Sequence, residues 1–156
     1  MVSPAPVRVV VTAADWHDPE AERLRLAQRA ELDARYGTDD HEPGPPPTAE
    51  DISVFVVARV DGVAVGCGGL RMLEPGSAEI KRMYVEPLSR GSGVAAAVLR
   101  ELESLARERS VTRLLLETGP GQPDAIRFYL REGYEQIANF GPYVGGDLSV
   151  CFARDL

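Results

Sequence analysis

The sequence EIKRMYVEPLSRGSGVAAAVLRELESLA, residues 79–106, contains in succession a strand, a glycine-bearing turn and a long amphipathic helix. The turn is Arg90-Gly91-Ser92-Gly93-Val94-Ala95. Two glycines directly before a helix let the backbone come close to a ligand and leave N–H groups free to point at it. Because a helix N-terminus also carries partial positive charge, the turn favours a phosphate or pyrophosphate as its ligand.

The meander that precedes this turn is predicted from strong local signals. Asp61-Gly62 joins two β-rich runs, 52–60 and 63–72, and this dipeptide is among the best hairpin turns available. A third strand, 78–85, follows a further turn and leads into the glycines. Three antiparallel strands are therefore expected before the helix.

The N-terminal part is expected to add one strand and one helix. The β-branched run 7–12 predicts a strand, and Asp18-Pro19 predicts the cap and first position of a charged helix that ends at Gly37. The proline-rich, acidic segment 38–50 predicts an internal loop rather than a domain boundary.

The C-terminal part continues from the amphipathic helix. Five of its charged residues are expected to cover its solvent face: Arg100, Glu101, Glu103, Arg107 and Glu108. The apolar run 113–117 predicts a buried strand parallel to 78–85, because a βαβ crossover joins them. A helix at 124–132 and strands at 134–137 and 148–154 complete an α/β (mixed α+β) fold, a mixed sheet of about seven strands with helices on both faces.

Composition limits the class of protein. The 156 residues suit a single domain, 1–156, and 17 Lys and Arg against 24 Asp and Glu give a net charge of −7. This balance argues against nucleic-acid binding, which requires a basic surface, and is compatible with a cationic substrate such as an amine. No run approaches the roughly 20 apolar residues that span a membrane.

Two isolated cysteines, Cys67 and Cys151, lie in apolar runs. They provide neither a disulfide framework nor a metal site, so reduced, buried thiols in a cytoplasmic protein without a metal are expected. Whether two chains form a homodimer is left open by the sequence.

Other phosphate-binding motifs fit the turn poorly. A dinucleotide fingerprint requires a third glycine where Ala96 stands, and it requires a doubly wound sheet rather than a meander. A P-loop requires Gly-Lys-Ser/Thr, which the turn lacks.

A second motif makes the pattern more specific. Residues 83–95, from Met83-Tyr84-Val85 through the turn, are followed at a suitable distance by DAIRFYLREGY, residues 124–134. Together they resemble the two motifs of the GNAT superfamily of acetyl-CoA-dependent N-acetyltransferases, and the resemblance covers nearly the whole chain. It implies the GNAT-type fold, acetyl-CoA as cosubstrate, and transfer of acetyl to a primary amine by direct attack in a ternary complex.

The resemblance also implies a binding site for the donor. The backbone of residues 90–95 would wrap the pyrophosphate, and the strand at Met83, Tyr84 and Val85 would offer main-chain groups to the pantetheine arm. Two positions depart from the family pattern. Ser92 stands where a basic residue is usual, and Gln122 stands where many members have an asparagine that contacts the cofactor arm.

Acetyl transfer also requires proton transfer. An alkylamine has a pKa of roughly 10, so it arrives protonated and must lose a proton before it attacks. The resemblance assigns Tyr129 as the acid for the leaving thiolate, with a core position beside Phe128 as the alternative. It assigns Glu79 as the base by likeness to the histone-acetyltransferase branch. A strand acid paired with Lys81, or a base acting through water, are the alternatives to Glu79.

The acceptor pocket is less well defined by the sequence. Tyr36, at the end of the first helix, and Tyr143, in the glycine-rich loop before the last strand, lie where the family shapes this pocket. The acids Asp39, Asp40 and Glu42 could attract a cationic amine or could simply be solvated. The two histidines, His17 and His41, are expected on the surface.

The sequence is therefore compatible with three functions. The first is an N-acetyltransferase of a small-molecule amine, which the absence of an added peptide-binding region favours slightly. A protein lysine or N-terminal acetyltransferase is the second. The third is a non-catalytic acyl-CoA-binding sensor, which would have no need of Glu79 and Tyr129.

Overall fold

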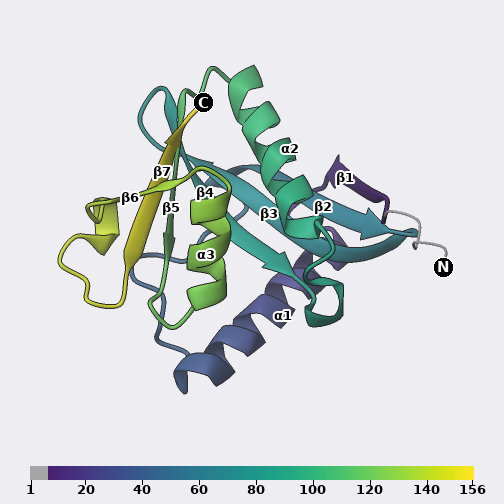
Figure 1. Ribbon diagram of the computed structural model, residues 1–156, viewed down its shortest axis with the longest axis horizontal. Coiled ribbons are helices and arrows are strands. Elements are labelled where there is room, and N and C mark those ends of the chain that lie inside the picture. Colours follow the sequence, from purple (N-terminus) through teal and green to yellow (C-terminus); the bar gives the residue numbers. More distant parts are fainter. Residues whose placement is uncertain (1–6) are drawn as a thin grey trace.

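A computed structural model describes residues 7–156. Within them one seven-stranded sheet has the order β1-β2-β3-β4-β5-β7-β6 (Figure 1). The strands are β1 (Val9–Ala13), β2 (Ile52–Val60), β3 (Val63–Met72), β4 (Ser77–Val85), β5 (Arg113–Thr118), β6 (Glu135–Ile137) and β7 (Val150–Asp155). Neighbouring strands are antiparallel except β4 and β5, which are parallel. The predicted mixed sheet is confirmed.

Helices cover both faces of the sheet, as predicted. The described residues form α1 (Pro19–Tyr36), α2 (Val94–Glu108) and α3 (Pro123–Arg131), with short 3₁₀ turns at Pro87–Ser89 and Gly141–Tyr143. In Figure 1, α2 and α3 lie on the near face and α1 lies on the far face. The sheet therefore separates a side carrying the glycine turn from a side carrying α1.

The first helix begins and ends where the sequence predicts. The Asp18 side chain accepts hydrogen bonds from the N–H groups of Glu20 and Ala21, and Gly37 ends the helix with φ 71°. Ala21 and Leu24 are buried against Phe55 and its neighbours, while most of α1 is polar. One face of this helix is therefore free to line a solvent-filled site.

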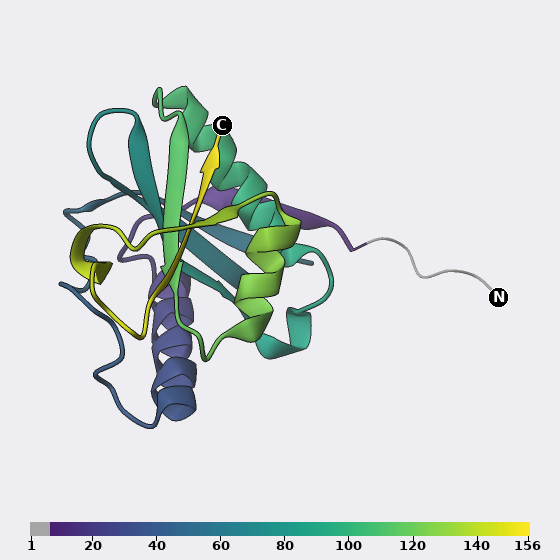
Figure 2. The same cartoon turned by 60° about the vertical axis from the view of Figure 1, so that its left-hand side comes forward.

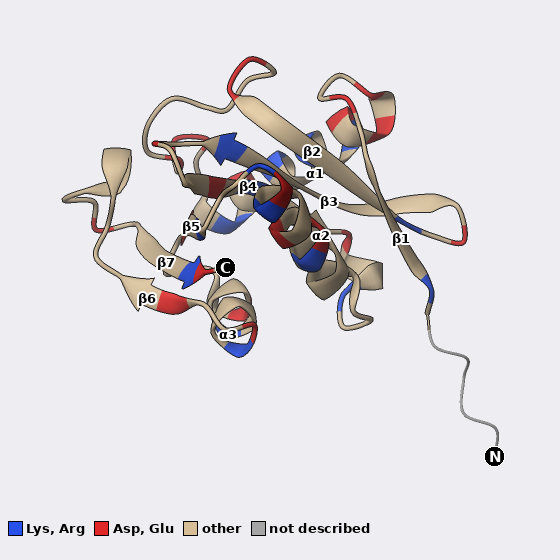
Figure 3. Ribbon diagram, turned by 90° about the horizontal axis from the view of Figure 1, so that it is seen from above, with Lys and Arg blue, Asp and Glu red and all other residues tan. Residues whose placement is uncertain are grey.

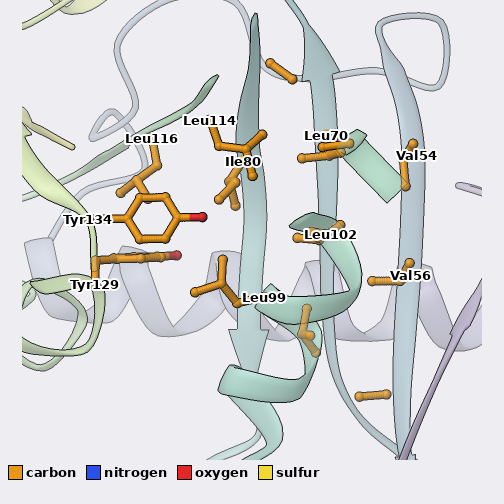
Figure 4. Close-up of a cluster of buried hydrophobic side chains, with 14 of the residues drawn as sticks. Val54, Val56, Leu70, Ile80, Leu99, Leu102, Leu114, Leu116, Tyr129 and Tyr134 are labelled. Carbon is orange, nitrogen blue, oxygen red and sulfur yellow. The ribbon is translucent and has the colours of Figure 1, made fainter. Parts of the chain in front are cut away.

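The main core lies between the sheet and α2. Val98, Leu99 and Leu102 are fully buried there, with sheet residues such as Val56 and Leu70 (Figure 4). The helical spacing of the apolar residues explains why this face of α2 is buried.

Glu103 corrects the sequence analysis, because it lies in the core and not on the solvent face of α2. Its side chain is only 2% exposed. The Tyr134 hydroxyl and the Arg154 guanidinium each donate to its Oε2 at 2.8 Å, and Arg100 pairs with its other oxygen. Partners from distant parts of the chain thus satisfy a charge that helical periodicity alone places in solvent.

A bulge interrupts β4 just before the glycine turn. Cys67 and Gly69 on β3 face Tyr84 and Lys81 on β4, so two residues of β4 lie opposite one of β3. Arg82 takes φ 60° at this point. A bulge leaves its extra residue outside the ladder and redirects the strand. The bulge lies beyond Glu79, the last residue of β4 that pairs with β5.

The parallel pairing of β4 and β5 is short. It joins residues 77–79 to residues 113–115 and ends there. Beyond Glu79 and Leu115 the two strands part, and side chains rather than a ladder fill the space. This parting opens the cleft described below.

Two loops lie over the same side of this opening (Figure 2). They are loop 38–51, between α1 and β2, and loop 138–149, between β6 and β7. They touch: a Cβ on Gly44 would lie 2.9 Å from Cβ of Pro142. The two loops are therefore in contact with each other.

The charged side chains are mixed. Figure 3 shows acidic and basic residues interleaved along the helices rather than gathered in one basic region. No helix in residues 7–156 is long and apolar enough to cross a membrane. Cys67 and Cys151 are free and buried, and burial raises the pKa of the Cys67 thiol to about 12, which suits a core residue and not a nucleophile.

Candidate active site

A cleft lies where β4 and β5 part, with a volume of about 120 Å³. Its walls on the α2–α3 side include Ile80, Leu116 and Tyr129. The cleft continues to the α1 side, where polar residues of α1, loop 38–51 and β5 line it. One end is thus apolar and the other polar, as expected of a small-molecule site.

The glycine turn is open and lies at a helix N-terminus. Gly91 and Gly93 take φ 80° and 89°, and a Cβ on either would meet nothing within 4 Å. The helical ladder begins with the Ala97 N–H donating to the Gly93 carbonyl. The N–H groups of the three preceding residues, Val94 to Ala96, therefore have no acceptor within the helix. An open turn at a helix N-terminus fits a phosphate group.

Arg90 holds the turn in place. Its Nε donates to the Val85 carbonyl at 2.8 Å, and its Nη2 lies 2.8 Å from both carboxylate oxygens of Glu31 on α1. The Ser92 hydroxyl donates to the Ser89 carbonyl at 2.5 Å. Both side chains stabilise the loop itself, so the outer, ligand-facing surface of the turn is main chain.

The strand at Met83, Tyr84 and Val85 lies at the edge of the cleft. Met83 lines it, and the Met83 carbonyl accepts a hydrogen bond from Gln28 Nε2 at 2.8 Å. The Tyr84 ring packs toward α1, and burial raises its pKa. Only main-chain atoms of Tyr84 are therefore available to a ligand on the α2 side.

Tyr129 lies both in the core and in the cleft wall. It is 6% exposed, and its ring contacts Phe128 edge-on at a centroid distance of 5.1 Å. The Tyr134 ring lies beside it, also edge-on, at a centroid distance of 5.7 Å (Figure 4). Burial raises its pKa above the ordinary value of a tyrosine. Tyr129 therefore packs in the core and also lines the cleft, so a core position does not exclude the predicted role.

Glu79 is sealed from the cleft. It is 2% exposed, and Tyr143 donates its O–H to Glu79 Oε2 at 2.5 Å. Lys81 Nζ and Arg71 Nη1 each lie 3.7 Å from a Glu79 oxygen. Burial, and then the charge of Glu79, raise the pKa of Tyr143, which is itself 1% exposed. Glu79, which the resemblance assigns as the base, therefore interacts with Tyr143 and does not line the cleft.

The acids of loop 38–51 behave differently from one another. Asp39 and Asp40 are exposed. Glu42 is bound by three cations, Arg29, Lys81 and Arg82, at 3.2, 3.3 and 3.0 Å. Burial alone would raise the pKa of Glu42, but Arg82 and Lys81 outweigh it and hold the pKa below its usual value. Glu42 therefore anchors the loop to β4.

Tyr36 and Gln122 meet across the cleft. Gln122 Nε2 donates to the Tyr36 hydroxyl at 3.3 Å, and a Cβ on Gly119 would lie 2.0 Å from the same oxygen. The end of α1 therefore packs directly on the turn before α3, where glycine alone leaves room. Both residues line the cleft, as expected for donor and acceptor contacts.

His41 corrects the expectation of a surface histidine, whereas His17 is exposed as predicted. The His41 side chain is 5% exposed and lines the cleft. Its Nε2 lies 2.7 Å from Asp33 Oδ1, and its ring stacks on Tyr36 at 5.4 Å. The surrounding loop is so polar that sequence alone gives no signal of this packing.

Glu117 is a cleft residue that the sequence analysis did not single out. It lies on β5 just beyond the point where β4 and β5 part, and Ser149 donates its hydroxyl to Glu117 Oε2 at 2.8 Å. Burial raises the pKa of this carboxyl above its usual value. A charged residue at the end of an apolar strand, Leu114 to Leu116, was the available signal.

Comparison with known proteins decides the family. The model of the acetyltransferase (GNAT) family matches residues 14–134, which include the meander, the glycine turn and α3. The chain belongs to the GNAT acetyltransferase family. The predicted family is confirmed, and with it the enzyme class, an acetyltransferase.

Individual relatives agree with this GNAT assignment. The chain is 39% identical over 103 residues to an IAA acetyltransferase of Azospirillum brasilense, in a match that covers 65% of this chain and 67% of the relative. A crystal structure of a provisionally assigned acyl-CoA N-acyltransferase of Klebsiella pneumoniae is 36% identical, with a TM-score of 0.78 over 95% of this chain and 97% of that one. A GNAT acetyltransferase of Elizabethkingia anophelis with acetyl-CoA bound shares the fold at 16% identity, with a TM-score of 0.69 over 95% and 98%.

Proposed function

We propose that this GNAT acetyltransferase transfers the acetyl group of acetyl-CoA to a primary amine of a small molecule, by direct attack within a ternary complex. One observation carries the proposal. The cleft between β4 and β5 has Met83, Gln122 and Tyr129 in its wall and polar residues on the α1 side, and the open turn at the start of α2 follows the same strand, β4, along the chain. We also take residues 1–156 as one acetyltransferase domain.

The donor would bind along main chain. The pyrophosphate would lie on the N–H groups at the start of α2, where Gly91 and Gly93 leave space. The pantetheine arm would follow β4 at Met83 and Val85, on the side where the strand has lost its β5 neighbour. Gln122 would contact the same arm from the start of α3.

Tyr129 would act at the thioester sulfur. A thiol has a pKa of roughly 8.5, so a tyrosine with a raised pKa keeps its proton while the thiolate forms. Its O–H can therefore stabilise the developing charge, and it can give up its proton as it receives another.

The acceptor is best explained as a small molecule. The cleft has a volume of about 120 Å³, which suits a small acceptor better than an extended peptide. The Azospirillum relative is named for IAA, a compound and not a protein. Tyr36, which lines the cleft beside His41, would contact such an acceptor. Tyr143 would support the pocket from behind, because its hydroxyl is bound to Glu79.

Two measurements test this function. Acetyl-CoA at a hundredfold excess over its dissociation constant should stabilise the protein by about 2.7 kcal/mol, and no thermal shift would contradict donor binding. A panel of amines, amino acids and peptides, assayed by thiol release from acetyl-CoA, should identify small primary amines as acceptors. Binding without thiol release from any of them would favour the sensor, and release with peptides alone would favour a protein acetyltransferase.

A further inference from the structure

We propose that Glu117 is the catalytic base that removes the proton from the acceptor's ammonium group. This inference rests on the proposed function, because it assigns a residue to the acceptor side of the same cleft. It replaces Glu79, the base that the family resemblance suggests, with a carboxylate on the neighbouring strand.

Strand geometry places Glu117 at the cleft. Leu115 of β5 is the last residue paired with β4, opposite Glu79. Side chains alternate along a strand, so Glu117 lies on the same face of the sheet as Leu115 and Glu79 but beyond the end of the ladder. There it lines the cleft, together with Thr118 and Tyr129.

Glu79 cannot take this role in the observed arrangement. One of its oxygens accepts the short Tyr143 hydrogen bond, and Arg71 lies beside the other. It does not line the cleft, and it is 2% exposed. Glu79 lines a different pocket, with Arg71 and Phe140, and Tyr129 is not among the residues around that pocket.

The surroundings of Glu117 suit a base. The groups that face it are Lys81 and Glu79 on β4, Glu42 in loop 38–51, Tyr143 in loop 138–149 and Cys151 on β7. Burial raises its pKa most, the charges of Glu42 and Glu79 raise it further, and Ser149 and Lys81 oppose them. The same burial lowers the pKa of a bound ammonium, so the two pKa values move toward each other.

Glu117 and Tyr129 together account for each proton that moves in the reaction. Glu117 accepts one proton from the ammonium, and the freed nitrogen lone pair forms the C–N bond to the thioester carbonyl carbon. The C–S bond breaks as the second nitrogen proton passes to sulfur through the Tyr129 hydroxyl, which gives one proton and takes one. Glu117 then releases its proton to water. The products are an amide, a free thiol and one proton.

The test is the pH dependence of kcat/KM, measured by thiol release with acetyl-CoA and the amine of the panel that reacts fastest. In wild type, kcat/KM should fall at low pH as Glu117 becomes protonated, which gives the profile an acidic limb. Glu117→Gln should lose that limb and at least tenfold in rate, with its acetyl-CoA thermal shift unchanged. Glu135→Gln, at an exposed strand glutamate on β6, is the matched control and should behave as wild type.

Ser149→Ala provides a readout that a purely structural role would not affect. The Ser149 hydroxyl stabilises the charged form of Glu117, so its removal should raise the pKa of Glu117 and move the acidic limb to higher pH. An unmoved limb would overturn the assignment. So would a limb that survives Glu117→Gln and disappears in Glu79→Gln or His41→Gln.

The experiment distinguishes a wrong assignment of Glu117 as the base from a wrong proposed function. If wild type releases no thiol with any amine, the function itself is wrong. If wild type is active and Glu117→Gln retains both its rate and its limb, only the assignment of the base is wrong.

Discussion

The donor end and the acceptor end of the cleft are made in different ways. At the proposed donor end the free groups are the main-chain N–H groups of one continuous segment, Val94 to Ala96, and the side chains of Arg90 and Ser92 are occupied within the protein. At the acceptor end, side chains from α1, two loops, β4 and β5 converge in a network of ion pairs. A backbone site depends on local conformation, whereas a side-chain site depends on long-range packing.

This difference predicts which positions of the cleft tolerate substitution and which do not. A turn that binds through main chain tolerates many side chains, provided that its glycines remain. A pocket built from Glu42, Lys81 and His41 changes its chemistry with every substitution. The difference between the two ends can therefore be tested by substitutions, first at Tyr129, which lies between them, and then at each end.

The largest effect is expected at the meeting point. Tyr129→Phe removes the hydroxyl that would pass a proton to sulfur, so kcat should fall about a hundredfold. Acetyl-CoA should still stabilise the protein as in wild type, since the turn is untouched. Because the pKa of Tyr129 is raised, the hydroxyl should set no alkaline limb below about pH 10 in wild type. Retention of full turnover in Tyr129→Phe would remove Tyr129 from the mechanism.

The next effect tests whether the acceptor end depends on buried side-chain partners. Tyr143→Phe leaves Glu79 without its closest donor in a buried position, which should cost about 1–3 kcal/mol of unfolding free energy. Tyr36→Phe, which loses a hydrogen bond of 3.3 Å in a less buried position, is the matched control and should cost clearly less. Equal denaturation midpoints for the two variants would contradict the tightly bonded wall described for Glu79.

A smaller effect tests the donor end. Ser92→Lys restores a cation between the glycines and should strengthen acetyl-CoA binding by about twofold to fivefold, while Ser92→Asp should weaken it similarly. Calorimetric titrations at low and high salt should show the two variants converge as salt is added. Ser104→Asp, on the exposed middle of α2, is the control for charge alone. If it matches Ser92→Asp, the turn has no special role.

The smallest effect concerns stability against pH. Burial raises the pKa of folded Glu117 above its unfolded value, so its contribution is fully present at low pH and is lost as pH rises through the folded pKa. Since the side chain is partly exposed, the effect should stay below about 1 kcal/mol. Glu117→Gln should therefore gain stability relative to wild type between pH 4 and pH 7, as measured by denaturant unfolding. A relative loss over that range would contradict the raised pKa.

Sequence reasoning succeeded where the signals were local. The cap at Asp18, the hairpin at Asp61-Gly62 and the glycines before α2 each act through their own backbone, and the structure places their elements as predicted. The parallel pairing of β4 and β5 followed from the βαβ crossover rule.

It failed where a residue's environment is set by distant partners. Glu103 is polar on an amphipathic helix, and nothing near it in the sequence reveals that Tyr134 and Arg154 bury its charge. His41 lies in a proline-rich acidic loop, yet it packs on Tyr36 because Glu42 fixes that loop to β4. Glu117 lines the cleft because the pairing of β4 with β5 ends at Glu79 and Leu115, and nothing local in the sequence marks that end.

The glycine turn is also joined to α1, the helix that lines the acceptor end, by the pair between Arg90 and Glu31. Binding equilibria that share such a connection obey linkage, so any factor by which acceptor changes donor affinity must equal the factor by which donor changes acceptor affinity. Glu31→Gln, which weakens the pair, should therefore move the two affinity factors toward a value of 1 by the same amount. The quantity that both measurements report is the coupling free energy of the ternary complex, and we expect this surface ion pair to contribute to its size.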